Sequence, residues 1–211
     1  MAITKELNVL EIWFRNVLNE LFYSKNDVAH QIDHIDEVWL NACDLINDNG
    51  IIGIDRTILF FGIYLHDIFS GVDRKNHNLL AGYYILDYGY REHSELKILD
   101  YLSDFERKII VDMILFHRSS INIKDYKPSD PSRYQYVNLI RAADKGAPIF
   151  SEYLERSLNF NGGDIENVKK HFIEKFSEDG YAWENDPMYK ELYRNEYEIF
   201  QKELKEWLEG H

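Results

Sequence analysis

Apolar residues recur at three- and four-residue intervals along most of the chain. This spacing places them on one face of an α-helix. No stretch of useful length alternates between apolar and polar residues, as a half-buried strand would. The pattern therefore predicts an all-α protein. The first apolar run consists of Leu7, Leu10, Phe14, Val17, Leu18 and Leu21.

Residues that favour helix ends divide the first half of the chain. A second helix is predicted over about 28–46, because residues 47–50 (Asn-Asp-Asn-Gly) favour turns and left-handed caps. Asp55 can cap a third helix, which we expect to run through His66 and Asp67.

A loop marked by Gly71 and Asp73 leads to a fourth helix, expected to begin near Lys75 and to carry His77. The next boundary is clearer. Ser103 and Glu106 fit a capping box, in which each side chain accepts a hydrogen bond from the other's free backbone amide.

The capped helix is expected to end around His117. Residues 118–131 contain two prolines and predict a loop, and 132–146 predict a further helix. After a break at 161–163, Asp164 can cap the next helix, and Asp186-Pro187 suits the start of the last one. The expected organisation is an N-terminal helix at 1–27, a helical core at 28–147 and a C-terminal helical region at 148–211 that packs on the core.

Composition agrees with a folded domain. Hydrophobic residues make up 45% of the 211 residues and aromatic residues 15%, enough for a sizeable core. No apolar run approaches the roughly 20 residues that span a bilayer, and the first residues do not resemble a signal peptide. The single cysteine, Cys43, allows no intramolecular disulfide, so a reducing cytoplasmic location is expected.

The formal net charge of -13 argues against polymeric nucleic acid as the main partner, because backbone binding needs clusters of Lys and Arg. A small phosphorylated substrate is still compatible with this charge, since bound divalent metals reverse the local potential.

The candidate chemistry centres on the adjacent pair His66-Asp67, which follows an apolar run at 58–61. Adjacent side chains on a helix diverge by roughly 100°, so the pair suits one ligand per metal, or an Asp that bridges two metals. Taken singly, each residue has an ordinary explanation. A lone His is usually exposed or hydrogen-bonded in a core, and Asp144 could form a buried ion pair with Lys145 or Arg141.

The residues taken in order carry more information. The series His, His-Asp, His, His, Asp resembles the HD superfamily of metal-dependent phosphohydrolases. The segments that carry the resemblance are 34–39, 65–68, 77–82, 114–117 and 140–145. Glu37 departs from the pattern, because that position is commonly Arg. The resemblance covers about residues 28–146 and implies an HD-domain helical bundle with a C-terminal helical extension.

The resemblance also implies a site. One or two divalent metals (Mn, Fe, Co, Ni, Zn or Mg) would be held, and Asp67 would bridge them. Metal-bound hydroxide would attack the phosphorus of a nucleotide or other small phosphate ester. The implied metal ligands are His34, His66, Asp67, His77, His117 and Asp144.

Cations are needed for the phosphate oxygens. Besides Asp67, the resemblance and sequence proximity suggest catalytic roles for Arg118 and Lys145. His30, Lys75 and Arg141 are candidates for substrate binding, while Arg74 and Arg133 are also near. For each of these cations, ordinary surface charge is the simpler explanation. The aromatic residues Tyr64, Phe69 and Tyr83 could stack a nucleobase, although core packing is the simpler reading.

Two other functions fit the same pattern. A few HD proteins are di-iron oxygenases, and the chain could also be a non-catalytic helical module that binds metal. The amphipathic helices after Pro148 could pack over the core, form a homodimer surface or cover the site, and packing over the core is the simplest arrangement. No membrane partner is expected.

Overall fold

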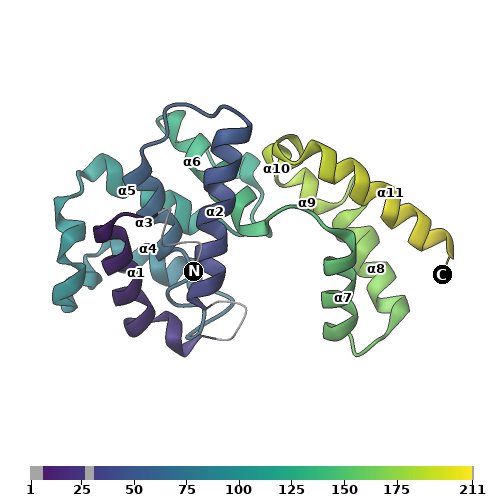
Figure 1. Cartoon of the computed structure of the whole chain (residues 1–211), viewed down its shortest axis with the longest axis horizontal. Helices are drawn as coiled ribbons and strands as arrows, with labels where there is room; N and C mark the ends of the chain where they lie inside the picture. The colour runs from purple at the N-terminus through teal and green to yellow at the C-terminus, as the bar shows by residue number, and fades with distance from the viewer. Residues whose placement is uncertain (1–6, 27–30, 211) are drawn as a thin grey trace. The chain divides into compact units, whose positions relative to one another are not determined.

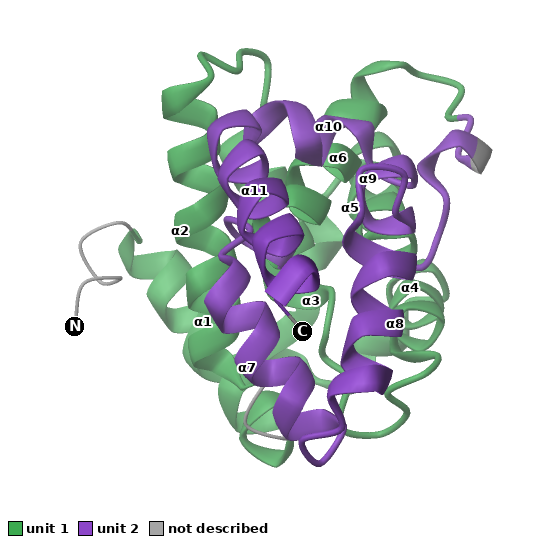
Figure 2. Ribbon diagram, turned by 90° about the vertical axis from the view of Figure 1, so that its right-hand side faces the viewer, with its two compact units in different colours: residues 1–118, 128–144 green, residues 119–127, 145–211 purple. Residues whose placement is uncertain are grey.

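The computed structural model describes residues 7–26 and 31–210, and within these ranges the regular structure is helical, without strands. The chain forms two compact units (Figures 1 and 2). Unit 1 comprises residues 1–118 and 128–144, and unit 2 comprises 119–127 and 145–211. The prediction of an all-α protein is confirmed for the described residues.

Unit 1 is built around α3, whose residues Ile58 to Leu65 are all buried. α5 packs against both α3 and α4. Glycine allows one of these close approaches: a Cβ on Gly82 of α4 would lie 2.5 Å from Leu115 Cδ2 of α5. The helices of unit 1 are α1 (Val9–Leu21), η2 (Tyr23–Lys25), α2 (Ile32–Asp48), α3 (Arg56–Leu65), α4 (His77–Leu86), η4 (Gly89–Glu92), η5 (Ser94–Tyr101), α5 (Asp104–Phe116) and α6 (Ser132–Lys145), whose last residue belongs to unit 2.

Unit 2 has an aromatic core in which Phe150, Phe172, Phe176, Trp183 and Phe200 are buried and in mutual ring contact. Its helices are η6 (Ile123–Asp125), α7 (Phe150–Phe160), α8 (Ile165–Phe176), α9 (Tyr181–Glu184), α10 (Pro187–Leu192) and α11 (Arg194–Gly210).

Three of the expected caps are confirmed. Asp55 accepts hydrogen bonds from the amides of residues 57 and 58, and Asp164 accepts one from the amide of residue 167. Ser103 and Glu106 form the complete capping box at the start of α5. These caps were predictable because each depends on neighbours in the sequence.

Several predicted boundaries were wrong by a few residues. α3 ends at Leu65 and does not run through His66 and Asp67, and α4 begins at His77 rather than near Lys75. α2 extends two residues beyond 46.

The segment predicted as the last helix forms two helices, α10 and α11, which are separated at Tyr193. The side chain of Asp186 does not cap α10 but pairs with Lys145 at 2.6 Å. No helix in the described residues is long and apolar enough to cross a membrane.

Candidate metal centre

The six predicted metal ligands all lie in unit 1 and come together from five helices. α2 carries His34, and His66 and Asp67 follow directly after α3. His77 is the first residue of α4, His117 is the C-terminal cap of α5, and Asp144 lies in the last turn of α6.

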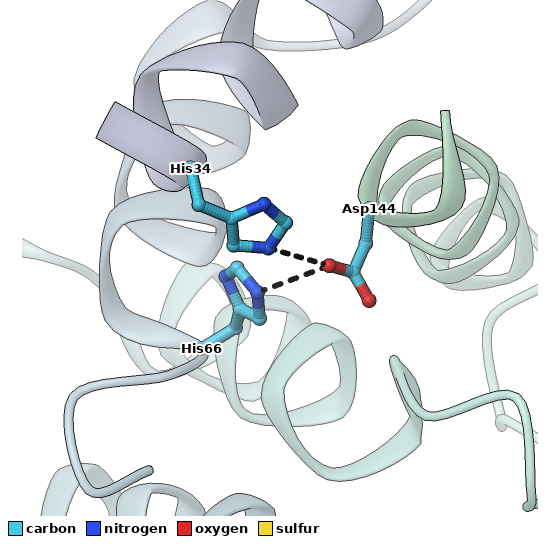
Figure 3. A group of neighbouring side chains, drawn as sticks. All are labelled: His34, His66 and Asp144. Atoms are coloured by element: carbon cyan, nitrogen blue, oxygen red, sulfur yellow. Dashed lines mark hydrogen bonds and ion pairs between the residues drawn. The ribbon is translucent and has the colours of Figure 1, made fainter. Parts of the chain in front are cut away.

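A first group consists of His34, His66 and Asp144. Oδ1 of Asp144 lies 3.1 Å from Nε2 of His34 and 3.7 Å from Nε2 of His66. Figure 3 shows both imidazoles turned towards the same carboxylate from different elements. Asp144 therefore contacts two imidazoles that come from distant parts of the sequence.

A second group consists of His66, Asp67 and His117, with His77 beside it. Oδ1 of Asp67 lies 2.9 Å from Nε2 of His77 and 3.5 Å from Nε2 of His117. The other oxygen, Oδ2, lies 3.6 Å from Nε2 of His66. One carboxylate thus faces imidazoles on two sides.

Adjacent residues at the end of α3 serve different sides of the centre. α3 ends at Leu65, but its cap His66 keeps helical backbone angles, so the side chains of His66 and Asp67 still diverge. Nε2 of His66 lies near Asp144 and Oδ2 of Asp67, whereas Oδ1 of Asp67 lies towards His77 and His117.

Three of the imidazoles are fixed in the same way. Nδ1 lies 2.6 Å from the carbonyl of residue 63 in His66, 2.8 Å from that of residue 74 in His77, and 2.7 Å from that of residue 114 in His117. A carbonyl only accepts, so Nδ1 carries the proton and donates it. This leaves Nε2 of each ring facing the centre, which is the arrangement typical of metal-binding histidines.

The contact between His77 and His117 is informative. Their Nε2 atoms lie 3.1 Å apart. With the proton of each neutral ring on Nδ1, two lone pairs face each other, which is unfavourable unless a proton or a cation lies between them. A metal ion satisfies both nitrogens together.

The burial of His66 and Asp67 also favours a cation in the centre. His66 is completely buried and Asp67 almost so, and His66 Nε2 and Asp67 Oδ1 make no hydrogen bond with acceptable geometry despite the close ionic contacts. Polar atoms left in this state destabilise a protein. A cation at this position would supply the missing partner.

Burial and nearby charges act in opposite directions on the pKa of His66. Burial disfavours its charged form, but the carboxylates of Asp67 and Asp144 outweigh burial and raise the pKa to about 9. At Asp67, burial is likewise outweighed by the surrounding imidazoles, which hold the pKa of the carboxyl well below its usual range. At His117 burial prevails and lowers the pKa.

The residues fit a divalent metal. Ligand atoms about 2.0–2.2 Å from one ion lie about 3–3.6 Å from each other at tetrahedral or octahedral angles. The separations of 2.9–3.7 Å observed here lie within this range or just outside it. Imidazole nitrogen with carboxylate oxygen suits Mn, Fe, Co, Ni and Zn.

Asn26 supports the centre and was not identified from the sequence. Its side-chain amide donates to Ser70 Oγ at 2.8 Å and to the Asp67 carbonyl at 3.4 Å, and its Oδ1 accepts from the Gly71 amide at 3.1 Å. Gly71 has no room for a Cβ because Asn26 lies against it. No local pattern signals this role, since the partners lie more than forty residues away.

Two further asparagines hold ligand-bearing helices together, and sequence analysis missed both. Asn41 of α2 donates to the carbonyl of Ala143, next to Asp144, at 3.0 Å. Asn78 of α4 donates to the carbonyl of Leu115, near His117, at 2.8 Å.

The predicted cations have different surroundings. Lys75 is exposed, and Arg118 donates to the Lys75 carbonyl. Arg141 is completely buried and donates to the carbonyls of Phe116 and Arg118. Lys145, in unit 2, pairs with Asp186 at 2.6 Å.

Of the remaining candidates, Arg74 contributes its backbone carbonyl, which accepts from Nδ1 of His77. Arg133 pairs with Asp112, and Arg74 and Glu37 are exposed. His30 lies outside the described residues. Of the three aromatic residues considered for base stacking, Tyr64 is buried and hydrogen-bonded to Asp36, Phe69 is half-buried and Tyr83 is exposed.

Comparison with known proteins gives no relative. No protein-family model matches the chain, and no curated protein or solved structure matches it.

Proposed function

We propose that the chain is a metal-dependent phosphohydrolase of the HD type, acting on a nucleotide or another small phosphate ester. One observation carries the proposal: Asp67 turns one oxygen towards His66 and the other towards His77 and His117. A carboxylate shared between two groups of imidazoles suits a pair of cations. The order of these residues along the chain is the feature that resembles the HD superfamily.

Divalent metals bound there would activate water as a nucleophile and neutralise charge on the phosphate. The protein's own part is to hold the ligands ready. The Nδ1–carbonyl hydrogen bonds of His66, His77 and His117 fix the rings before any cation arrives. Asp67 and Asp144 supply the negative charge that offsets the cations.

Arg118 and Lys75 are the cations best suited to bind the phosphate. The Arg118 guanidinium rests on the carbonyl of Lys75, in the loop that leads directly to His77. Their positive charges would attract an anionic substrate to a protein whose net charge of -13 otherwise repels it. Lys145 is less suited to this role because its ammonium already pairs with Asp186.

The test is elemental analysis of the purified protein, followed by a phosphatase screen over nucleotides with each metal supplied. We expect one or two metal ions per chain and release of phosphate. Asp67→Asn should lower activity by more than the roughly 10–100-fold typical of losing a partner that only orients a ligand. His171→Gln, a half-buried histidine of unit 2, is the matched control and should leave activity unchanged.

Other outcomes identify the alternatives. Bound iron with oxygen-dependent turnover would favour a di-iron oxygenase, whereas turnover with Mn, Co or Ni without oxygen would exclude it. Metal binding without any turnover would favour a non-catalytic module. If the protein binds no divalent metal, and His66→Ala changes neither metal content nor stability, all the metal-based functions fail.

A further inference from the structure

Arg141 has an unusual position for a charged residue, since its side chain is completely buried. Its Nη1 lies 2.6 Å from the carbonyl oxygen of Phe116 and 2.7 Å from that of Arg118. These two carbonyls stand on either side of His117. A single guanidinium nitrogen therefore holds the backbone immediately before and after a candidate metal ligand.

The contact of Arg141 with these carbonyls lies at the C-terminal end of α5. The last carbonyls of a helix have no partner within the helix, and a positive charge near them is favourable. α5 ends at Phe116, and His117 is its cap. The ring of His117 is itself oriented by the carbonyl of residue 114, in the last turn. The direction of His117 Nε2 therefore depends on that turn keeping its geometry.

Arg141 also connects this end of α5 to Asp144. Both residues belong to α6 and are three positions apart, so they lie on neighbouring parts of one helix face. His117 belongs to the group with His66 and Asp67, whereas Asp144 belongs to the group with His34 and His66. The guanidinium is thus a direct link between helices that serve different groups.

We propose that Arg141 is a positioning residue, which holds His117 in place so that a metal ion of its own can bind on the side of Asp67 that faces His77 and His117. The inference rests on the metal centre of the proposed function but not on phosphate hydrolysis. It assigns Arg141 a role inside the fold, in place of contact with substrate.

The test is metal stoichiometry and affinity, measured with Co²⁺ and Mn²⁺ on the full chain by elemental analysis and calorimetric titration. Arg141→Lys keeps the charge but lacks the planar guanidinium. We expect the Arg141→Lys protein to bind one metal ion with the wild-type affinity and a second metal ion about 10–100-fold more weakly. His117→Ala should weaken the same equivalent, and adding Arg141→Lys to it should have no further effect.

Arg133→Lys is the matched control, because Arg133 lies on the same helix and also reaches α5, where it pairs with Asp112. It should bind both equivalents normally. Should Arg141→Lys not fold, Arg141→Gln keeps a hydrogen-bond donor without the charge and is measured in the same way.

Two results would overturn the proposal. One is normal binding of both equivalents by the folded Arg141 variants. The other is equal weakening of both equivalents, which would make Arg141 a general structural residue. A wild-type protein that binds two metals but hydrolyses no phosphate ester would defeat the proposed activity and leave the role of Arg141 standing.

Discussion

At the scale of single residues, the backbone that carries Asp67 depends on a distant side chain. Asn26 holds the turn after Asp67 through Ser70 and Gly71. Asn26→Ala removes these hydrogen bonds and leaves buried groups unpaired, so we expect it to lower the free energy of unfolding by about 1–3 kcal/mol. It should also weaken metal binding by about 10–100-fold.

Asn49→Ala is a suitable comparison for this variant. Asn49 also donates to a backbone carbonyl, that of Leu45, but at the exposed end of α2. Chemical denaturation and metal titration of both variants would measure their stability and their metal affinity. Equal metal affinity in the two would show that Asn26 does not support the centre.

Residue chemistry also explains what the sequence could reveal. The order of these His and Asp residues resembles the HD superfamily, and this resemblance selected six side chains that the fold brings together. Asparagine has many roles. Nothing near Asn26 in the sequence indicates that its partners are Ser70 and Gly71.

At the scale of elements, the spacing between α4 and α5 positions His77 against His117. Each helix carries one of these residues at an end, and their Nε2 atoms are 3.1 Å apart. Gly82 permits this spacing because a Cβ there would lie 2.5 Å from Leu115. Gly82→Ala should therefore cost about 1–3 kcal/mol of stability through overpacking.

The same change should weaken metal binding by the group that contains His117. Gly210→Ala gives the comparison, because a Cβ at that helical position meets nothing within 4 Å. Thermal unfolding and metal titration would be measured on both. Wild-type metal affinity in a destabilised Gly82→Ala protein would mean that the helix spacing does not set the ligand geometry.

Elements differ in how far the sequence could predict them. The capping box depends only on Ser103 and Glu106, which are three residues apart, and it predicted the start of α5. The 3₁₀ helix η5 gave no comparable signal. Its buried residues Leu96 and Leu99 are three apart, which fits either a 3₁₀ or an α-helix over so short a segment. The end of α3 was also missed, because buried residues continue through His66 and Asp67 to Ile68, beyond the last helical residue.

At the scale of the whole molecule, the division into units follows contacts that the sequence does not display. Residues 119–127 belong to unit 2, yet the chain returns to unit 1 at 128–144. The predicted core at 28–147 includes residues 119–127, because no local pattern shows which unit a loop packs against. The packing of the C-terminal region on the core stays a prediction.

This division leads to a prediction about metal removal. All six candidate ligands lie in unit 1. A ligand that binds only the folded state stabilises it, by about 4 kcal/mol at a concentration 1,000 times its dissociation constant. Adding Co²⁺ to chelator-treated protein should therefore raise the melting temperature of unit 1. For a domain of this size, each kcal/mol corresponds to about 4 °C.

Unit 2 supplies an internal control for that experiment. Trp183 is its buried tryptophan, whereas Trp39 is buried in unit 1, so single-tryptophan variants that keep one or the other report on each unit separately. The rise in melting temperature should be seen in the variant that keeps Trp39. It should be absent when His66→Ala is added. A shift of the same size in His66→Ala would place the metal elsewhere. Identical melting with chelator and with Co²⁺ would mean that the buried imidazoles and carboxylates satisfy each other without a cation.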